Sequence, residues 1–135
     1  MDKPSQSDKV ILDQTPEKMY ESEQHFRALF DNSPCGLLFA TPETGEFLEC
    51  NRRICEMLGY SKEELKQLSV ADIHREEDLP RVMQAFRKMA NSEKGQSQNV
   101  TVKRKDGGIF YANISSFWIK HQGKKCLVGA FLDVT

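Results

Sequence analysis

The segment that most constrains the fold is residues 51–65, NRRICEMLGYSKEEL. Asn51 is a favourable N-cap for a short helix, and Gly59 can supply the left-handed residue at which that helix ends. Ser61 precedes Glu64 by three residues, which is the capping-box spacing that begins a second helix. The segment therefore predicts two short helices in succession. The first has an apolar face formed by Ile54, Cys55, Met57 and Leu58.

A second segment, residues 103–115 with the sequence KRKDGGIFYANIS, predicts a β-hairpin. Either Gly107 or Gly108 can adopt the positive φ that a tight hairpin turn requires. Side chains in the outgoing strand alternate between the two faces of a sheet. One face carries Ala112, Ile114 and Ser116, and the other carries Tyr111, Asn113 and Ser115.

An amphipathic helix is expected near the N-terminus. Thr15 can act as its N-cap, Pro16 suits the first helical position, and the residues Asn-Ser-Pro at 32–34 end it. Its apolar stripe is narrow, so we expect the helix to lie on a surface or to pair with a second copy, giving a homodimer. The stripe consists of Met19, Phe26, Leu29 and Phe30.

The other elements follow from turn and capping signals. Asp78 and Pro80 open a longer helix after an irregular connector. The sequence also predicts a first hairpin from strands at 35–41 and 46–50, a polar loop at 91–98 and a last strand at 126–134 after a turn at 121–124. Five strands in a two-then-three order predict an α+β fold, with a five-stranded antiparallel sheet covered on one face by helices. We expect a flexible lead at 1–14, the flanking helix at 15–32 and one domain at 33–135.

Composition excludes several classes of protein. A net charge of -1, from 19 basic and 20 acidic residues, provides no basic surface for nucleic acid. The longest apolar runs are too short to cross a bilayer. The N-terminal residues lack the apolar core of a signal peptide, so we expect a cytoplasmic chain with no membrane segment.

Cysteine and histidine spacing predicts neither a metal site nor a catalytic centre. Four cysteines, at positions 35, 50, 55 and 126, include no CxxC pair, so we expect free thiols. His74 precedes a run of acids, where a solvated helix start is favoured over a pH-sensitive switch. No nucleophile with a base and no paired carboxylates are recognisable, so we expect a regulatory domain rather than an enzyme.

Taken in order, several segments resemble the PAS sensory-domain family over residues 26–135. FRALFDNSPCGLLF resembles the entry helix and first strand, and NRRICEMLGYSKEEL resembles the helix pair with its Gly-Tyr-Ser junction. IHREEDLPRVMQAF resembles the connector and long helix, KRKDGGIFYANIS the central hairpin, and GAFLDVT the final strand. The resemblance implies a small cavity between sheet and helices. It also implies a sensory or dimerisation role beside an output domain such as a histidine kinase or a diguanylate cyclase.

The resemblance also bears on cofactors. Photochemical flavin members carry a reactive Cys after the Gly-Tyr junction, and this chain has none between Gly59 and Asp78. Haem-binding members commonly take an axial His from the long helix, and 79–90 contains none. Redox-sensing flavin members tend to have a Trp just before the central hairpin, where 95–98 reads Gly-Gln-Ser-Gln. Haem and photochemical flavin are therefore disfavoured, which leaves an unknown small ligand or none.

Residues facing one another across the sheet and helices are the candidate pocket lining. Small side chains on the strands would leave space there, whereas Phe86 and Phe131 could instead fill it and make the core solid. The candidates are Leu37, Phe39, Ile54, Leu58, Val82, Phe86, Val102, Ala112, Ile114, Ser116, Leu127, Gly129 and Phe131.

Two further features suggest how a signal leaves the domain. Asp133 and Thr135 resemble the family's exit motif, in which a carboxylate and a hydroxyl can cap a following helix; an ordinary polar strand end is the alternative. Phe117 and Trp118 are adjacent, so one of them faces away from the core and can mark a docking surface. Two functions are thus expected as alternatives: a ligand-binding sensory module, or a ligand-free dimerisation and docking module.

Overall fold

The computed structural model describes residues 16–91 and 94–135, so the expected lead at 1–14 and the expected N-cap Thr15 lie outside the described residues. The chain divides into two units, the first ending at Phe30 and the second comprising residues 31–135. The described part of the first unit is helix α2, Pro16–Asp31, up to Phe30. On it Met19, Phe26 and Leu29 are exposed, and the rings of Phe26 and Phe30 stack with centroids 5.2 Å apart. Pairing of this helix with a second copy stays a prediction.

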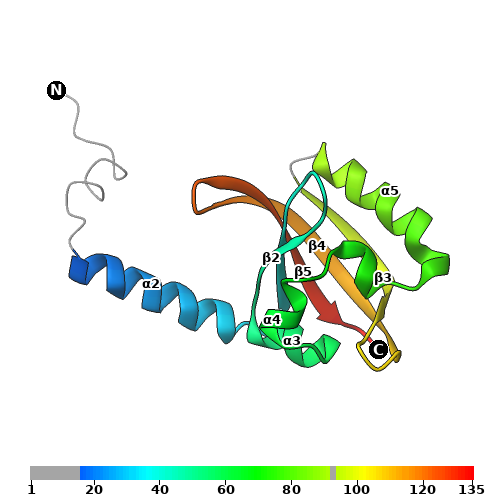
Figure 1. Cartoon of the computed structure of the whole chain (residues 1–135), viewed down its shortest axis with the longest axis horizontal. Helices are drawn as coiled ribbons and strands as arrows, with labels where there is room; N and C mark the ends of the chain where they lie inside the picture. Colours follow the sequence, from blue (N-terminus) through cyan, green and yellow to red (C-terminus); the bar gives the residue numbers. More distant parts are fainter. Residues whose placement is uncertain (1–15, 92–93) are drawn as a thin grey trace. The chain divides into compact units, whose positions relative to one another are not determined.

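A five-stranded antiparallel sheet forms the centre of the second unit, in the order β2-β1-β5-β4-β3 (Figure 1). The last strand lies between β1 and β4 and so joins the two hairpins. The α+β class and the five-stranded sheet predicted from the sequence are confirmed. The strands are β1 Gly36–Ala40, β2 Phe47–Cys50, β3 Lys94–Lys103, β4 Ile109–His121 and β5 Lys124–Asp133.

Between β2 and β3 the chain crosses one face of the sheet, here called the inner face (Figure 1). Helices α3 and α4 pack against β1 and β2, and α5 packs against the two 3-10 turns. These turns form the connector that was expected to be irregular. The elements are α3 Arg52–Leu58, α4 Lys62–Leu65, η1 Val70–Ile73, η2 Glu76–Asp78 and α5 Leu79–Ala90.

The local signals around α3 and α4 act as predicted. Asn51 Oδ1 accepts from the Ile54 amide at 3.0 Å, and Gly59 ends α3 with a φ of 81°. The Glu64 amide donates to Ser61 Oγ at 3.1 Å, and the Ser61 amide donates to Glu64 Oε1 at 2.9 Å. Each bond satisfies a donor that a helix start would otherwise leave unpaired.

The expected facing of β1 needs correction. Its inward side chains are Leu38 and Ala40, whereas Leu37 and Phe39 point to the opposite, outer face. There the Phe39 ring meets His121 edge-on, with centroids 5.2 Å apart. Leu38, Phe39 and Ala40 are all buried, so β1 lacks the polar–apolar alternation from which facing can be deduced.

The polar loop expected at 91–98 also needs correction, because β3 already begins at Lys94. Gly95 pairs with Ser116 of β4, and the register shifts between Ser97 and Val100. A strand at the edge of a sheet is held by backbone hydrogen bonds and has polar side chains where it meets water. Its composition therefore resembles that of a loop.

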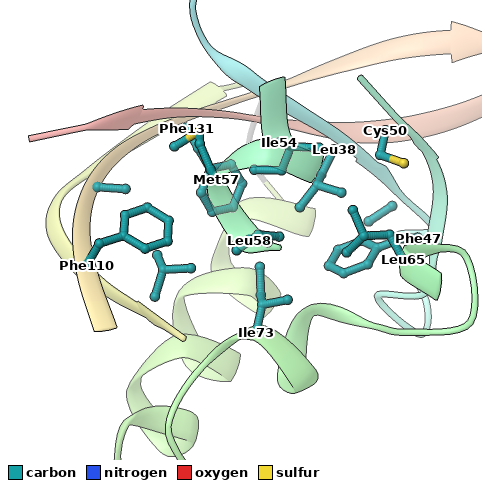
Figure 2. Packing of buried hydrophobic residues seen from close by; sticks show 13 residues of the cluster. Leu38, Phe47, Cys50, Ile54, Met57, Leu58, Leu65, Ile73, Phe110 and Phe131 are labelled. Carbon is teal, nitrogen blue, oxygen red and sulfur yellow. The ribbon is translucent and has the colours of Figure 1, made fainter. Parts of the chain in front are cut away.

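The core lies between α3 and the inner face of the sheet (Figure 2). Figure 2 shows Leu38, Ile54 and Leu58 converging there, with Phe110 and Phe131 along the sheet. Complete burial of an aliphatic side chain such as Ile54 contributes roughly 1.5–3 kcal/mol. This cluster therefore supplies much of the stability of the second unit.

Candidate functional site

A cavity of ≈ 250 Å³ lies between the inner face of the sheet, the 3-10 turn η1 and α5. Most of its wall is apolar, and a few polar side chains interrupt it. The lining residues are Leu38, Ala40, Phe47, Val70, Ile73, His74, Arg81, Val82, Ala85, Phe86, Met89, Ser97, Gln98, Asn99, Val100, Ile114, Ser116, Leu127, Gly129 and Phe131.

Incomplete packing of α5 and small residues on the sheet create this space. No side chain described between 79 and 89 is fully buried, although Val82, Phe86 and Met89 point into the cavity wall. On the floor, Gly129 has no side chain, and a Cβ there would come within 3.0 Å of the Phe131 ring. Phe86 and Phe131 therefore border the space rather than fill it.

Just over half of the candidate pocket residues lie on this cavity. They come from α5, β4 and β5, where the helical and strand periodicities were assigned correctly. These residues are Val82, Phe86, Ile114, Ser116, Leu127, Gly129 and Phe131. Their role in binding stays a prediction.

The other candidates lie elsewhere, which corrects the expected lining. Leu37 and Phe39 are on the outer face, as described above. The remaining four belong to the solid core beneath α3, because that helix packs directly on the sheet and leaves no room for a ligand. These four are Ile54, Leu58, Val102 and Ala112, each 0% exposed.

His74 is the cavity residue whose setting differs most from expectation. It is buried rather than solvated, and its Nδ1 lies 2.8 Å from the Thr101 carbonyl oxygen of β3. Burial lowers the pKa of His74 below its ordinary value, since the charged ring is poorly solvated there. The sequence signal that could have revealed the burial of His74 is the adjacent apolar residue Ile73. Ile73 is itself buried, so this part of the connector packs against the core.

The cavity rim is polar where β3 bulges. The Asn99 amide donates to Asn113 Oδ1 at 3.0 Å, and Asn99 adopts a positive φ of 53°. Ser97 and Gln98 lie beside it on the rim. Arg81 of α5 lies across from them, and its Nη2 donates to Asp78 Oδ1 at 3.4 Å. Sequence reasoning missed this rim because it treated the segment as a loop.

The turn of the second hairpin is anchored to α3 rather than free in solvent. Arg104 Nη1 donates to the Met57 carbonyl at 2.7 Å, and the Lys105 amide donates to the Leu58 carbonyl at 2.8 Å. Lys105 Nζ also lies 2.6 Å from Glu64 Oε2. Carbonyls at a helix end need such partners, so the basic residues of this turn serve the fold.

The expected exit segment is attached to β4. The Thr135 amide donates to Asp133 Oδ1 at 2.9 Å, and Thr135 Oγ1 accepts from the Tyr111 amide at 3.2 Å. The hydrogen bonds from the Thr135 side chain and backbone lower the pKa of the Asp133 carboxyl. The two residues after β5 are therefore hydrogen-bonded to Tyr111 of β4, and their role in signalling stays a prediction.

The thiols of Cys50 and Cys55 are not activated, because burial raises the pKa of both. Burial, reinforced by the neighbouring Cys55, raises the pKa of Cys50 to about 12. A thiol with so high a pKa is a poor nucleophile. Over residues 16–91 and 94–135, no three His, Cys, Asp or Glu side chains gather closely enough to hold a metal ion. Within the same part of the chain, no helix is sufficiently long and apolar to span a bilayer.

Comparison with curated proteins places similar segments in signalling proteins. The chain is 30% identical over 102 residues to the probable diguanylate cyclase DgcE of Escherichia coli (strain K12), covering 75% of this chain and 9% of that protein. It is 27% identical over 122 residues to the methyl sulfide methyltransferase-associated sensor of Methanosarcina acetivorans, covering 90% of this chain and 12% of the sensor. The chain thus spans about a tenth of the length of the curated relatives it matches.

Solved structures share the fold. The PAS domain of an HTR-like protein from Haloarcula marismortui superposes with a TM-score of 0.73 at 20% identity, covering 87% of this chain and 96% of that one. A domain of a sensory box sensor histidine kinase/response regulator from Geobacter sulfurreducens superposes with a TM-score of 0.68 at 23% identity. The match covers 86% of this chain and 98% of that one. The PAS domain of a LuxR-family regulator from Burkholderia thailandensis, solved with ethanol, superposes with a TM-score of 0.66 at 15% identity. The match covers 81% of this chain and 96% of that one.

The model of the PAS domain family matches residues 34–135, which include every strand and the cavity. Sequence, topology and family model therefore agree, and this chain belongs to the PAS domain family of sensory, signal-transducing domains.

Proposed function

We propose that this chain is the input module of a signalling protein, and that its cavity binds a small ligand. The observation that carries the proposal is the cavity of ≈ 250 Å³, walled by an incompletely buried helix. An apolar cavity of about 150 Å³ is enough to bind benzene, whereas drug-sized ligands need about 300 Å³ or more. The ligand is therefore of single-ring size with a few additional atoms. Ethanol, bound by the Burkholderia thailandensis relative, is smaller still.

The signal route that we propose runs along β5. Leu127, Gly129 and Phe131 line the cavity, and Asp133 follows two residues later on the same strand. A ligand that favours one packing of α5 over another shifts the population of the two states, and β5 carries the difference to the segment ending at Thr135. The output domain that we propose is of the histidine kinase or diguanylate cyclase type, acting in the cytoplasm in a homodimer assembled through α2.

A ligand-free docking module is the second candidate, and the outer face of the sheet favours it. Tyr111, Phe117 and Leu132 are exposed there, with 49%, 39% and 48% of their surface accessible. Phe117 is thus the outward member of its pair with Trp118. Neighbouring exposed aromatic and aliphatic side chains are typical of interaction surfaces.

Titration with p-xylene, followed by amide chemical shifts, tests the sensory proposal. Saturable shifts are expected at Ser116, Gly129 and Phe131, and they should extend to Thr135 if β5 relays the signal. Ser116→Leu fills the cavity and should weaken binding at least about tenfold, since the ligand loses its space. Ser115→Leu changes the adjacent residue on the outer face and is the matched control.

Equal loss of binding in both variants, or no saturable shift in the unmodified chain, would reject the cavity as a binding site and leave the docking module. A native mass spectrum of the same sample reports any molecule that copurifies and gives the oligomeric state. Deletion of residues 1–24 should remove the dimer. A dimer that survives the deletion would refute pairing through α2.

A further inference from the structure

His74 is the polar side chain of the cavity wall whose hydrogen-bonding character is determined by the fold. It is 3% exposed and follows η1, where the chain turns from the connector toward α5. The Thr101 carbonyl oxygen, 2.8 Å from Nδ1, can only accept a hydrogen bond. Nδ1 must therefore carry the hydrogen. In the neutral ring, Nε2 then has a lone pair and can act only as an acceptor.

The Nε2 lone pair is available to a ligand. The bond to Thr101 is the one hydrogen bond of His74 within the described parts of the chain. Those parts contain no fully buried side-chain nitrogen or oxygen without a partner, so Nε2 retains access to open space. His74 lines the cavity, which makes the cavity the space that the ring reaches.

Burial leaves the ring neutral, and the neighbouring charges do not reverse its effect. Asp78 would favour a protonated ring, but Arg75 Nε binds its carboxylate at 2.8 Å and Arg81 lies at 3.4 Å from its other oxygen. Burial is the main cause that lowers the pKa of the ring, and Arg81 adds to it by disfavouring a second positive charge nearby. The ring therefore presents an acceptor and not a donor.

The other polar groups around the cavity do not distinguish a ligand that donates a hydrogen bond from one that only accepts. Ser97, Ser116, Gln98 and Asn99 can each donate or accept. Arg81 only donates, but its side chain is 69% exposed and is engaged with Asp78 at the rim. His74 is thus the group that imposes a requirement on the bound molecule.

We propose that the cavity selects neutral small molecules with an apolar body and one hydroxyl or N–H group, which donates to Nε2 of His74. This inference rests on the proposed ligand-binding function and specifies the chemical class of the ligand. A molecule that offers only an acceptor, such as an ether, leaves the Nε2 lone pair unpaired and is bound less well.

Three probes of similar shape test the proposal: p-cresol, which has a donor; 4-methylanisole, which has only an acceptor; and p-xylene, which has neither. Dissociation constants are measured for the unmodified chain and for His74→Asn. The asparagine amide can keep the bond to the Thr101 carbonyl but has no acceptor at the position of Nε2. The dissociation constant of p-xylene, measured in each chain, corrects the other two constants for the change in cavity volume.

The ratio of the p-xylene to the p-cresol dissociation constant should fall about fivefold in His74→Asn, which is the size of one net hydrogen bond. The ¹⁵N resonance of His74 Nε2 should move with p-cresol and not with p-xylene. An unchanged ratio, or a preference for 4-methylanisole that depends on His74, would overturn the inference while leaving the cavity a binding site. Failure of all three probes to bind would overturn both the inference and the proposed function.

Discussion

Helices α3 and α5 lie on the same face of one sheet, yet they are held in different ways. The 7-residue α3 buries Ile54, Met57 and Leu58, whereas the 12-residue α5 has no fully buried side chain among those described at 79–89. The shorter helix therefore belongs to the core, and the longer one forms the wall of a cavity.

The two helices also differ in how their ends are capped: α3 has a side-chain partner at both ends, and α5 has none at its start. At the start of α3, Asn51 caps the helix and also accepts from the Leu37 amide at 2.9 Å, so a single buried side chain joins helix and sheet. At its end, Arg104 caps the Met57 carbonyl. Asp78, at the start of α5, makes no such capping bond, because its carboxylate is engaged by arginines. Regions with less burial open at lower free-energy cost, so α5 is where a ligand can shift the structure most readily.

The largest expected effect compares one aliphatic truncation in each helix. Ile54→Ala should lower the free energy of unfolding by about 3 kcal/mol, since it leaves a void in a solid core. Val82→Ala should cost about 1 kcal/mol or less, because that side chain is half-buried beside space that already exists. Chemical denaturation measures both values. Equal losses would show that α5 is as firmly packed as α3.

An intermediate effect is expected from two glycines. A Cβ on Gly36 would lie 3.1 Å from the Ile54 Cα and still closer to the Ile54 and Met57 side chains, so Gly36→Ala should cost about 2 kcal/mol by overpacking. A Cβ on Gly95 would meet only the flexible side chain of Met89. Gly95→Ala should therefore cost less than about 1 kcal/mol. Thermal unfolding compares the stability of the two variants. A greater loss of stability in Gly95→Ala would contradict the expectation that Met89 of α5 can move aside.

The smallest effect expected is on pH dependence, and it arises from His74. Its pKa is lowered in the folded state, so the unfolded chain binds the proton more readily. The stabilising contribution of the neutral ring is present above the ordinary histidine pKa of about 6.5 and is lost as the pH falls through the lower folded value. His74→Asn should remove this loss of stability from unfolding curves measured between about pH 7 and pH 5. A slope that persists unchanged in the variant would assign it to other groups.

Much of the fold could be predicted because its signals are local. The Gly59 turn, the Ser61–Glu64 capping box and the Asn51 cap each involve residues at most four positions apart. The order of strands and helices followed from these boundaries. The candidate site was predicted best on β4, β5 and α5, where periodicity is clear, and worst on β1, where residues buried on both faces show no alternation.

The sequence by itself determined most of the elements and their caps, because hydrogen bonds between near neighbours decide these features. Only the tertiary structure decided which face of β1 points inward, since that depends on pairing with β5, more than 80 residues away. It likewise decided that β3 extends over a polar segment, and that Arg104 caps a helix 47 residues earlier. The burial of His74 depends on a carbonyl 27 residues further along the chain. Such contacts combine elements from distant parts of the chain, and no local pattern specifies them.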